Sequence, residues 1–512
     1  MKKYIVSIIV TGLFTVGLSS CGEDFLTVRP TDKLEAGAPS TIQSIQQNLA
    51  ATYQILTMDS YADSEYNSIL LLSDLRSDDL FKAGNEANDR AGLYFLSLYS
   101  NTPSDVPAGI WTLYFTGLAR ANDAIQACEN VTDGTEEQVN RLSAEGHALR
   151  AYFVSQLWLL YGNIPWFDGE LSSPFMAKQL KADEVYQKII TDLDYAIAGN
   201  KLPGAVSGPD MGRVSKAMAQ MLKARVVMYQ NDQARYNEVL ADMVEIINNP
   251  AYGLMDTLEE IFLPSGEFCK ETIFETNQRP EGKTWGDAWK GYGTNLPVFI
   301  SPNSLVDPDG VFISGWGFGT VRQEAYDMYA PDDTRRDASI NDWRGAEYAI
   351  RFQDTGLFMR KYAARKECNV VVSGDNDLNF DNNLRIFRLP EAYLNAAELV
   401  LGGASAPGAQ SAQYYLDVVR ERAFGDKFQA NKMNATLENI KQERRLEFLG
   451  EGLRYWDLVR WGDAPRVLTE NNPEFFLTRT WDPAKNKYLP IPQSEIDKTK
   501  GYGEYELVQN PY

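Results

Sequence analysis

The chain has 512 residues, of which 44% are hydrophobic and 23% charged, so it can bury a sizeable core and is not wholly disordered. Its formal net charge of −21 repels phosphate backbones, which argues against nucleic acid as a partner. The only histidine, His147, weighs against triad hydrolases and His-based metal sites, because both chemistries rely on imidazole.

The first element in chain order is a secretory signal followed by a lipidation sequence. Two lysines precede the apolar run Tyr4–Leu18, which is too short to span a membrane. Leu-Ser-Ser then leads into Cys21, which resembles a bacterial lipobox, and Glu23-Asp24 resembles an export signal of surface lipoproteins. We expect residues 1–20 to be removed as a signal peptide. Lipid on Cys21 would then hold the protein in the outer membrane, facing the cell exterior.

Helical periodicity dominates the next segment, residues 21–250. Val214–Tyr229 and Tyr236–Asn248 each carry an apolar stripe and are separated by a short polar turn, which predicts an αα-hairpin. An earlier pair, Trp111–Asn130 with Glu137–Tyr161, predicts another hairpin. Such hairpins are the unit of tetratricopeptide-like bodies.

The composition changes over residues 251–383, where Gly, Pro, Asn and Asp become frequent and aromatic residues lose helical spacing. This composition predicts a loop-rich lobe with a few short β segments, such as Val370–Val372. Helices resume within residues 384–512 and are expected to complete the same body; they are predicted at Pro390–Leu401, Ser411–Arg422, Leu437–Gly450 and Leu453–Trp461. The predicted fold class is therefore mostly α, with an irregular lobe between two helical blocks.

Several motifs carry a specific resemblance to a known family. Glu443–Gly462 reads ERRLEFLGEGLRYWDLVRWG and resembles the C-terminal signature of the SusD/RagB family of Bacteroidetes surface lipoproteins. Arg150–Tyr152, Tyr161–Pro165 and the terminal Asn510–Tyr512 resemble other parts of that family, in the same order. The resemblance implies a tetratricopeptide-like body and a solvent-facing glycan or peptide site. It also implies that a SusC-like TonB-dependent outer-membrane transporter is the partner.

The signature also has a structural interpretation. Helical spacing would place four apolar side chains on one face: Leu446, Leu449, Leu453 and Trp456. Helical geometry would also bring Glu451 near Arg454 and Asp457 near Arg460. We interpret these charges as an ion-pair network that docks the last helices, in preference to a catalytic site.

The strongest candidate for ligand binding is the segment from Trp285 to Tyr292. Trp285, Trp289 and Tyr292 offer flat faces that can stack on the C–H groups of a sugar, and Asp287 can bind hydroxyls. The alternative is a hydrophobic patch that holds the lobe against the body.

Weaker candidates lie elsewhere in the chain. Trp316 stands between glycines, which favour exposed loops, and Trp343 lies in a similar aromatic loop; packing is the alternative for both. The family resemblance points to Asp78, Asp79 and Tyr94 as further ligand residues, with helix capping or packing as the alternative.

No cofactor is expected. Asp375–Asp381 resembles the start of a calcium loop, but Phe380 replaces the turn glycine and Ile386 replaces the bidentate acid. A chance polar turn is favoured, and calcium remains the alternative.

These observations predict a non-enzymatic surface lipoprotein that captures an oligosaccharide or polysaccharide and passes it to the transporter. Peptide capture is the alternative within the same family. A surface glycoside hydrolase is a further alternative, because 70 acidic residues will include accidental carboxylate pairs.

Overall fold

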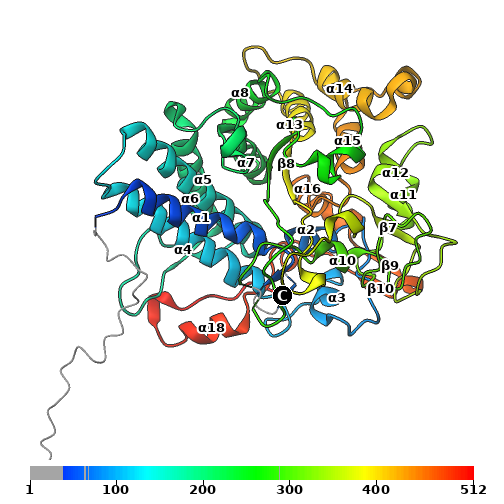
Figure 1. Ribbon diagram of the computed structural model, residues 1–512, viewed down its shortest axis with the longest axis horizontal. Helices are drawn as coiled ribbons and strands as arrows, with labels where there is room; N and C mark the ends of the chain where they lie inside the picture. Colours follow the sequence, from blue (N-terminus) through cyan, green and yellow to red (C-terminus); the bar gives the residue numbers. More distant parts are fainter. Residues whose placement is uncertain (1–38, 63–64, 67, 288) are drawn as a thin grey trace, which may run out of the picture. The chain divides into compact units, whose positions relative to one another are not determined.

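Paired helices build the first half of the chain in the computed structural model (Figure 1). The structure describes residues 39–62, 65–66, 68–287 and 289–512. The signal peptide and the lipidation expected at Cys21 lie outside these residues.

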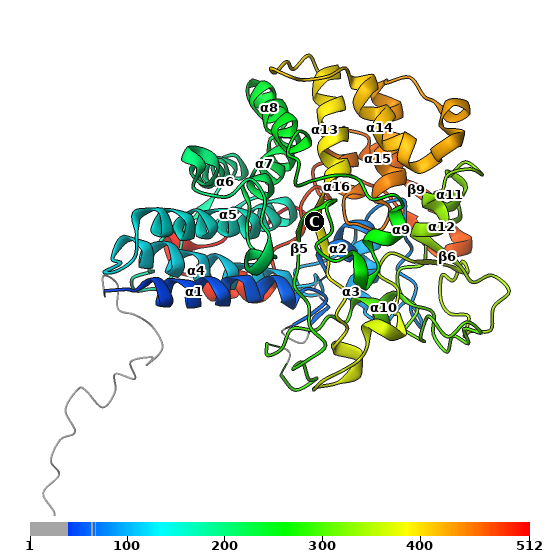
Figure 2. The same ribbon diagram turned by 45° about the horizontal axis from the view of Figure 1, so that its top comes forward.

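Antiparallel helix pairs follow one another along the chain, as predicted, and α1 lies beside α4 and α5 (Figure 2). The helices of this half are α1 (Ile42–Gln54), α2 (Ile69–Asp74), α3 (Ala91–Ser97), α4 (Gly109–Glu129), α5 (Glu136–Tyr161), α6 (Ala182–Ile197), α7 (Lys216–Gln230) and α8 (Tyr236–Ile247).

Local sequence explains where the longest helix, α5, begins and ends. Thr135 caps its first turn by accepting a hydrogen bond from the backbone N–H of Gln138, whose side chain returns the bond. Gly162 ends the helix with a φ of 66°. The apolar stripe between these ends is completely buried, at Leu149, Phe153, Leu157 and Leu160.

Residues 251–383 contain only short elements joined by long loops. These are α9 (Leu258–Ile261), β5 (Thr272–Glu275), α10 (Leu296–Ile300), α11 (Gln323–Asp327), α12 (Arg335–Ser339), β6 (Ile340–Asp342) and β7 (Leu357–Met359). The predicted strand Val370–Val372 is wrong. Val370 and Val372 are 69% and 73% exposed, and β-branched residues favour strands only on a paired, half-buried surface.

Each β-sheet in the described residues has two antiparallel strands. β5 pairs with β8 (Arg385–Arg388) and β6 with β7. The other pairs are β1 (Tyr61–Ala62) with β2 (Glu65–Tyr66), β3 (Ile164–Pro165) with β4 (Gln179–Leu180), and β9 (Glu470–Asn472) with β10 (Leu477–Arg479). The mostly α fold class is confirmed.

The C-terminal block contains further helices, and the first of them packs against α8 and against the next two. They are α13 (Leu389–Leu401), α14 (Ala412–Phe424), α15 (Leu437–Phe448), α16 (Arg454–Arg460), α17 (Ala464–Val467) and α18 (Gln493–Thr499). The separate helices expected at Leu437–Gly450 and Leu453–Trp461 are confirmed as α15 and α16, and Gly450 and Gly452 adopt φ values of 76° and 77° in the turn between them. A Cβ on Gly452 would lie 2.9 Å from the Cα of Leu70, so this turn also allows close packing.

The break redirects the charges of the signature. Asp457 and Arg460 form the expected pair at 2.8 Å, but Glu451 bonds instead to Arg388 and Lys361 at 2.8 and 2.6 Å. Nearby, the buried carboxylate of Glu447 contacts three guanidinium groups, at 3.3 Å for Arg335, 3.0 Å for Arg388 and 2.5 Å for Arg422. Ion pairs therefore join α12, β8 and α14 to α15.

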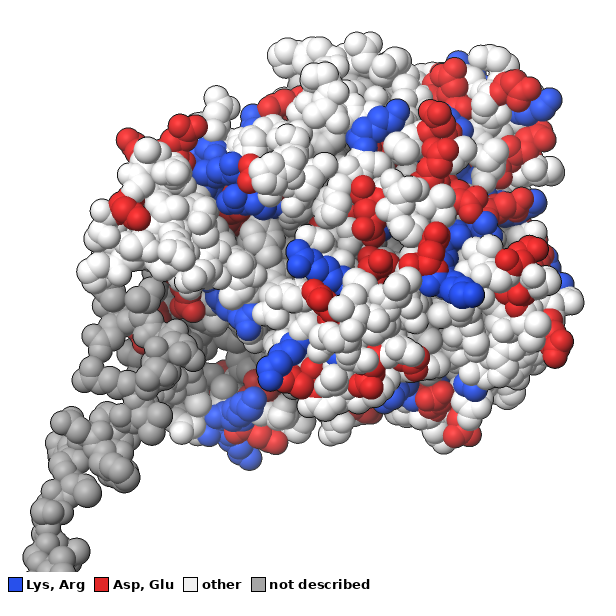
Figure 3. All heavy atoms as spheres, in the orientation of Figure 1, with Lys and Arg blue, Asp and Glu red and all other residues white. Residues whose placement is uncertain are grey.

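The surface carries charge of both signs. Acidic and basic side chains are interspersed on the face drawn in Figure 3. Across the described part of the chain, no helix is both long enough and apolar enough to cross a bilayer.

Candidate functional site

The strongest sequence candidate, the 285–292 segment, belongs to a hairpin-like loop at residues 279–292. At its base, the backbone N–H of Arg279 donates to the carbonyl of Tyr292 at 3.0 Å. At its tip, the N–H of Asp287 donates to the carbonyl of Thr284 at 3.1 Å. The N–H of Trp285 donates to the carboxylate of Asp375 at 2.8 Å, which fixes the backbone at the tip.

Trp285 stacks on Trp316, a residue of a different loop. Their ring centroids are 5.9 Å apart and their planes differ by 23°. Tyr61 packs edge-on against Trp285 at 5.0 Å, and Tyr66 packs edge-on against Trp316 at 5.9 Å. We call Tyr61, Tyr66, Trp285 and Trp316 the aromatic surface. Trp285 is 43% exposed, so this surface presents a flat indole to solvent.

Buried rings support the aromatic surface from behind. Tyr66 contacts Phe299 at 5.0 Å, and Phe299 stacks on Phe318 at 4.1 Å. The backbone N–H of Trp316 donates to the carbonyl of Val298 at 2.7 Å. These contacts place Trp316 on a rigid base, which suits a site that must be formed before its ligand arrives.

Polar groups border the aromatic surface. Arg90 is exposed, donates to the hydroxyl of Tyr66 at 2.9 Å and lies 4.2 Å from the centroid of that ring. Arg351 donates to the carbonyl of Trp316 at 3.3 Å. Burial raises the pKa of Asp377, and a hydrogen bond from Trp316 opposes this shift. Such groups can bind the hydroxyls of a ligand that stacks on the rings.

A buried lysine ties the 279–292 loop to the segment before β1. The ammonium of Lys283 donates to the carbonyl of Thr57 at 2.8 Å. Burial lowers the pKa of Lys283 to about 7, although the charge of Asp59 acts in the opposite direction. Burial also raises the pKa of Asp59 to about 6, against a hydrogen bond from the N–H of Ile69. These two groups hold Tyr61 and Trp285 in a common framework.

The other residues of the candidate segment face different surroundings. Asp287 pairs with Lys290 at 2.8 Å, and this hydrogen bond lowers the pKa of Asp287. Trp289 is partly buried against the main hydrophobic core, which favours packing over ligand contact. Tyr292 is 39% exposed but lines a separate cavity along α1.

Two of the weaker candidates, Trp343 and Tyr94, pack against other parts of the protein. Trp343 packs edge-on against Phe312 at 5.7 Å, with a buried indole nitrogen. Tyr94 donates its hydroxyl to the carbonyl of Phe476 at 2.7 Å and packs edge-on against Phe352. The structure therefore gives both residues a packing role.

Asp78 and Asp79, which were predicted as ligand residues, both form ion pairs with arginines, which favours the packing alternative. Asp78 accepts from Arg454 at 2.8 and 3.1 Å and pairs with Arg445 at 3.0 Å. Asp79 accepts from Arg445 at 2.7 Å and is 1% exposed. Carboxylates that are buried in ion pairs join the N-terminal segment to α15 and α16 and are unavailable to a ligand.

Tyr61, Tyr66 and Arg90 were not predicted from the sequence. The two tyrosines stand on β1 and β2, a pair of two-residue strands too short to give a periodic signal. Arg90 has a left-handed backbone with a φ of 55°, which sequence does not reveal for an arginine. The sequence gives the residue types of these three side chains but not their place in the fold.

The resemblance of Asp375–Asp381 to a calcium loop has a structural explanation. The carboxylate of Asp375 accepts from Trp285, and the amide of Asn379 donates to the carbonyl of Lys283 at 2.8 Å. Among the described residues, no group of three or more His, Cys, Asp or Glu side chains is arranged to hold a metal ion.

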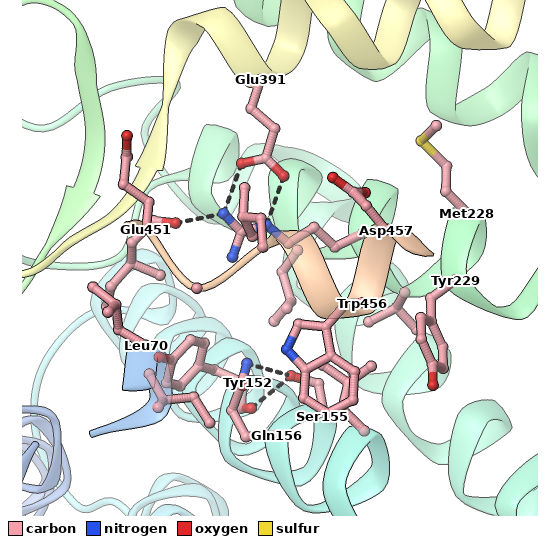
Figure 4. A pocket seen from close by; sticks show the side chains of 18 of the residues that line it. Leu70, Tyr152, Ser155, Gln156, Met228, Tyr229, Glu391, Glu451, Trp456 and Asp457 are labelled. Carbon is pink, nitrogen blue, oxygen red and sulfur yellow. Dashed lines mark hydrogen bonds and ion pairs between the residues drawn. The ribbon is translucent and has the colours of Figure 1, made fainter. Parts of the chain in front are cut away.

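A cavity of about 90 Å³ lies inside the helical body, lined by side chains of α5, α7, α13 and α16 (Figure 4). Glu391 and Trp456 border it, and Arg225 donates to Glu391 at 2.6 and 2.7 Å. At about 30 Å³ for each water, this space suits a few water molecules and is small for a sugar. The aromatic surface is therefore the candidate site.

Two sequence profiles match most of the chain between them. Residues 24–227 match a profile described as "Starch-binding associating with outer membrane". Residues 334–512 match a profile described as "SusD family".

Solved structures of similar proteins cover nearly the whole chain. Surface glycan-binding protein A from Bacteroides fluxus is 54% identical, with a TM-score of 0.89, over 92% of this chain and 100% of that one. Surface glycan-binding protein A from Bacteroides thetaiotaomicron, in complex with laminarihexaose, is 38% identical, with a TM-score of 0.86 and the same coverage. SusD-like protein P25 from Formosa agariphila is 24% identical over 78% of this chain and 79% of its own length.

Proposed function

Because the chain belongs to the SusD/RagB family, we propose that it binds a glycan at the cell surface and uses the aromatic surface as its platform. SusD-like glycan-binding proteins bind without catalysis, and we assign no catalytic residue to this chain. Its relative from Bacteroides fluxus, 54% identical, carries the name surface glycan-binding protein.

The stacked pair of Trp285 and Trp316 is the observation that carries this proposal. Trp285 is 43% exposed although it is a large apolar side chain, and it is supported by Tyr61. An exposed aromatic face that is held rigidly on other rings can stack on the C–H face of a sugar with little loss of entropy. The exposed guanidinium of Arg90 would supply donors to ring hydroxyls.

We further propose that the ligand is a β-glucan of the laminarin type. The structure of the relative from Bacteroides thetaiotaomicron contains laminarihexaose. Another similar structure, 29% identical, is described as a laminarin-binding SusD-like protein. A chain of glucose units presents repeated C–H faces, which match an extended aromatic platform.

The family resemblance supports two finer proposals. We assign a SusC-like TonB-dependent transporter as the partner that receives the glycan. We also assign Cys21 as the lipid-bearing residue that anchors the protein in the outer membrane, facing outward. Replacing Cys21 by alanine should release the protein from the membrane fraction, and retention in that fraction would contradict the anchor.

The proposed function can be tested by calorimetry with purified protein. Laminarihexaose, a panel of other oligosaccharides and a panel of peptides would be titrated separately, and each tube would then be searched for cleaved products. We expect heat of binding with laminarihexaose and no cleavage. Binding of peptides without any glycan response would select the alternative of peptide capture, and release of shorter sugars would contradict a pure binding protein.

A further inference from the structure

A second cavity lies along α1, on the side of the 279–292 loop that carries Tyr292. Its volume is about 540 Å³, within the range of about 300–1,000 Å³ that is common for ligand sites. Its wall includes α1, the segment Met211–Arg213 and the end of β5. None of the described side chains that line it makes a ring contact with Trp285 or Trp316.

One end of this cavity offers an aromatic face beside a free cation. Tyr292 is 39% exposed, and the guanidinium of Arg279 lies 5.8 Å from its ring centroid. Backbone hydrogen bonds fix the pair, because the N–H of Arg279 donates to the carbonyl of Tyr292 and the N–H of Tyr292 donates to the carbonyl of Glu281, both at 3.0 Å. Within the described part of the chain, the guanidinium of Arg279 contacts the ring of Tyr292 and pairs with no carboxylate. This distinguishes it from the arginines bound in ion pairs elsewhere.

Further polar groups on the wall are open to solvent. Asn277 and Gln46 are exposed, and their side chains make no hydrogen bond among the described residues. They offer amide donors and acceptors from two separate segments of the wall, Gln46 from α1 and Asn277 from the residues that follow β5. Amide and guanidinium groups of this kind bind the hydroxyl pairs of a sugar.

The floor of the cavity is preformed. Arg213 donates to the carboxylate of Glu145 at 2.6 Å, and the hydroxyl of Tyr53 donates to the same carboxylate at 2.8 Å. Leu49 and Leu56 are buried beneath. Since these charged groups already satisfy one another, the free polar groups near the rim are the ones left for a ligand.

We propose that this cavity is a second saccharide site, which takes neutral glucose units with Tyr292 as the stacking face and Arg279 and Asn277 as hydroxyl partners. This inference rests on the proposed glycan-binding function, but it does not require that the aromatic surface be the primary site. A single glucan chain long enough to pass the loop could occupy both sites, and short chains would occupy each independently.

Calorimetric titration with laminarihexaose and with its trisaccharide tests the inference. Three proteins are compared: the unaltered chain, the double variant Tyr292→Ala/Arg279→Ala, and the double variant Trp285→Ala/Trp316→Ala. Tyr292→Phe serves as the matched control, because it keeps the stacking face. Melting temperatures establish that each variant is folded.

We expect the unaltered chain to bind two equivalents of the trisaccharide, and each double variant to bind one. For laminarihexaose, Tyr292→Ala/Arg279→Ala should weaken affinity at least fivefold, while Tyr292→Phe changes it less than twofold. Isotherms of Tyr292→Ala/Arg279→Ala that match the unaltered chain in affinity and stoichiometry would overturn the second site alone. Absence of any glucan binding by the unaltered chain would overturn the proposed function and this site together.

Discussion

The carboxylate of Asp78 accepts two hydrogen bonds from the guanidinium of Arg454, at 2.8 and 3.1 Å. Arg445 adds a third contact at 3.0 Å. Asp78 follows α2 near the start of the chain, and both arginines belong to the C-terminal signature. This contact therefore joins the two ends of the fold.

Replacing Asp78 by asparagine should destabilise the protein by about 3 kcal/mol, because it leaves the largely buried guanidinium of Arg454 without its ion-pair partner, whereas Arg445 keeps Asp79. Chemical denaturation would measure this change. Glycan affinity of the folded variant should stay within twofold of the unaltered chain. A variant that keeps its stability but loses glycan binding would return Asp78 to the ligand site.

The same contact should make stability depend on pH in acid. Burial alone would raise the pKa of Asp78, but the charges of Arg445 and Arg454 outweigh burial and hold that pKa well below its usual range. A carboxyl with a lowered pKa stabilises the fold fully above its unfolded value near 4, and this stabilisation is lost as the pH falls below that value. Asp78→Asn should therefore show a smaller loss of melting temperature between pH 5 and pH 3 than the unaltered chain.

Among the charged side chains of the C-terminal block, Glu447 should cause the largest loss of stability when it is replaced. Its carboxylate is buried among Arg335, Arg388 and Arg422, whose charges hold its pKa well below the usual range despite burial. Glu447→Gln should cost about 3–5 kcal/mol of unfolding free energy, measured by denaturant titration. Glu438→Gln is the control, because Glu438 is 76% exposed and its pairing should contribute about 1 kcal/mol or less. Equal effects of the two substitutions would contradict this assignment.

Lys283 should give the fold a rise in stability at alkaline pH. Burial lowers its pKa to about 7, whereas an unfolded lysine titrates near 10.4, so the unfolded chain binds more protons between these values. The free energy of unfolding should then rise between pH 7 and pH 10, by at most about 1.4 kcal/mol for each pH unit from this group. Lys283→Met should flatten the rise, as measured by denaturation across that range. If the free energy of unfolding of Lys283→Met rose with pH as steeply as that of the unaltered chain, the lowered pKa of Lys283 would be contradicted.

Sequence periodicity was sufficient for the long helices and insufficient for the site. The stripe Leu149–Leu160 identified α5 because a 3.6-residue repeat is a local property of the chain. The two helices on either side of Gly450 and Gly452 were expected, but the pairing of Glu451 with Arg454 was wrong, because Glu451 bonds to Arg388 and Lys361, which are distant in sequence. Local patterns do not contain that information.

Only part of the candidate site could be predicted from the sequence, because the site depends on contacts between distant segments. Trp285 and Trp316 were recognised as aromatic residues in glycine-rich loops, but their stacking depends on how two distant loops meet. Tyr61 joins them from β1, near the other end of the chain. Asp78 appeared suitable for a ligand, since its arginine partners lie far away in sequence. Contacts between distant segments decide which candidates are free.

Trp289 offers a contrast with Trp285 within the same loop. Trp289 is packed against the core, so Trp289→Ala should lower the melting temperature by several degrees through lost burial. Its effect on glycan affinity should be smaller than that of Trp285→Ala. Thermal unfolding and titration of the two variants side by side would check this difference, and an unchanged melting temperature for Trp289→Ala would contradict the packing role.

The affinity of Trp285→Ala for laminarihexaose tests the central claim most directly. Loss of a stacking indole should raise Kd at least tenfold, which corresponds to about 1.4 kcal/mol, while the melting temperature stays within about 2 °C because Trp285 is 43% exposed. Trp343→Ala is the matched control and should leave Kd unchanged. An unaltered Kd for Trp285→Ala, in a protein that binds laminarihexaose, would contradict the assignment of the aromatic surface as the glycan site.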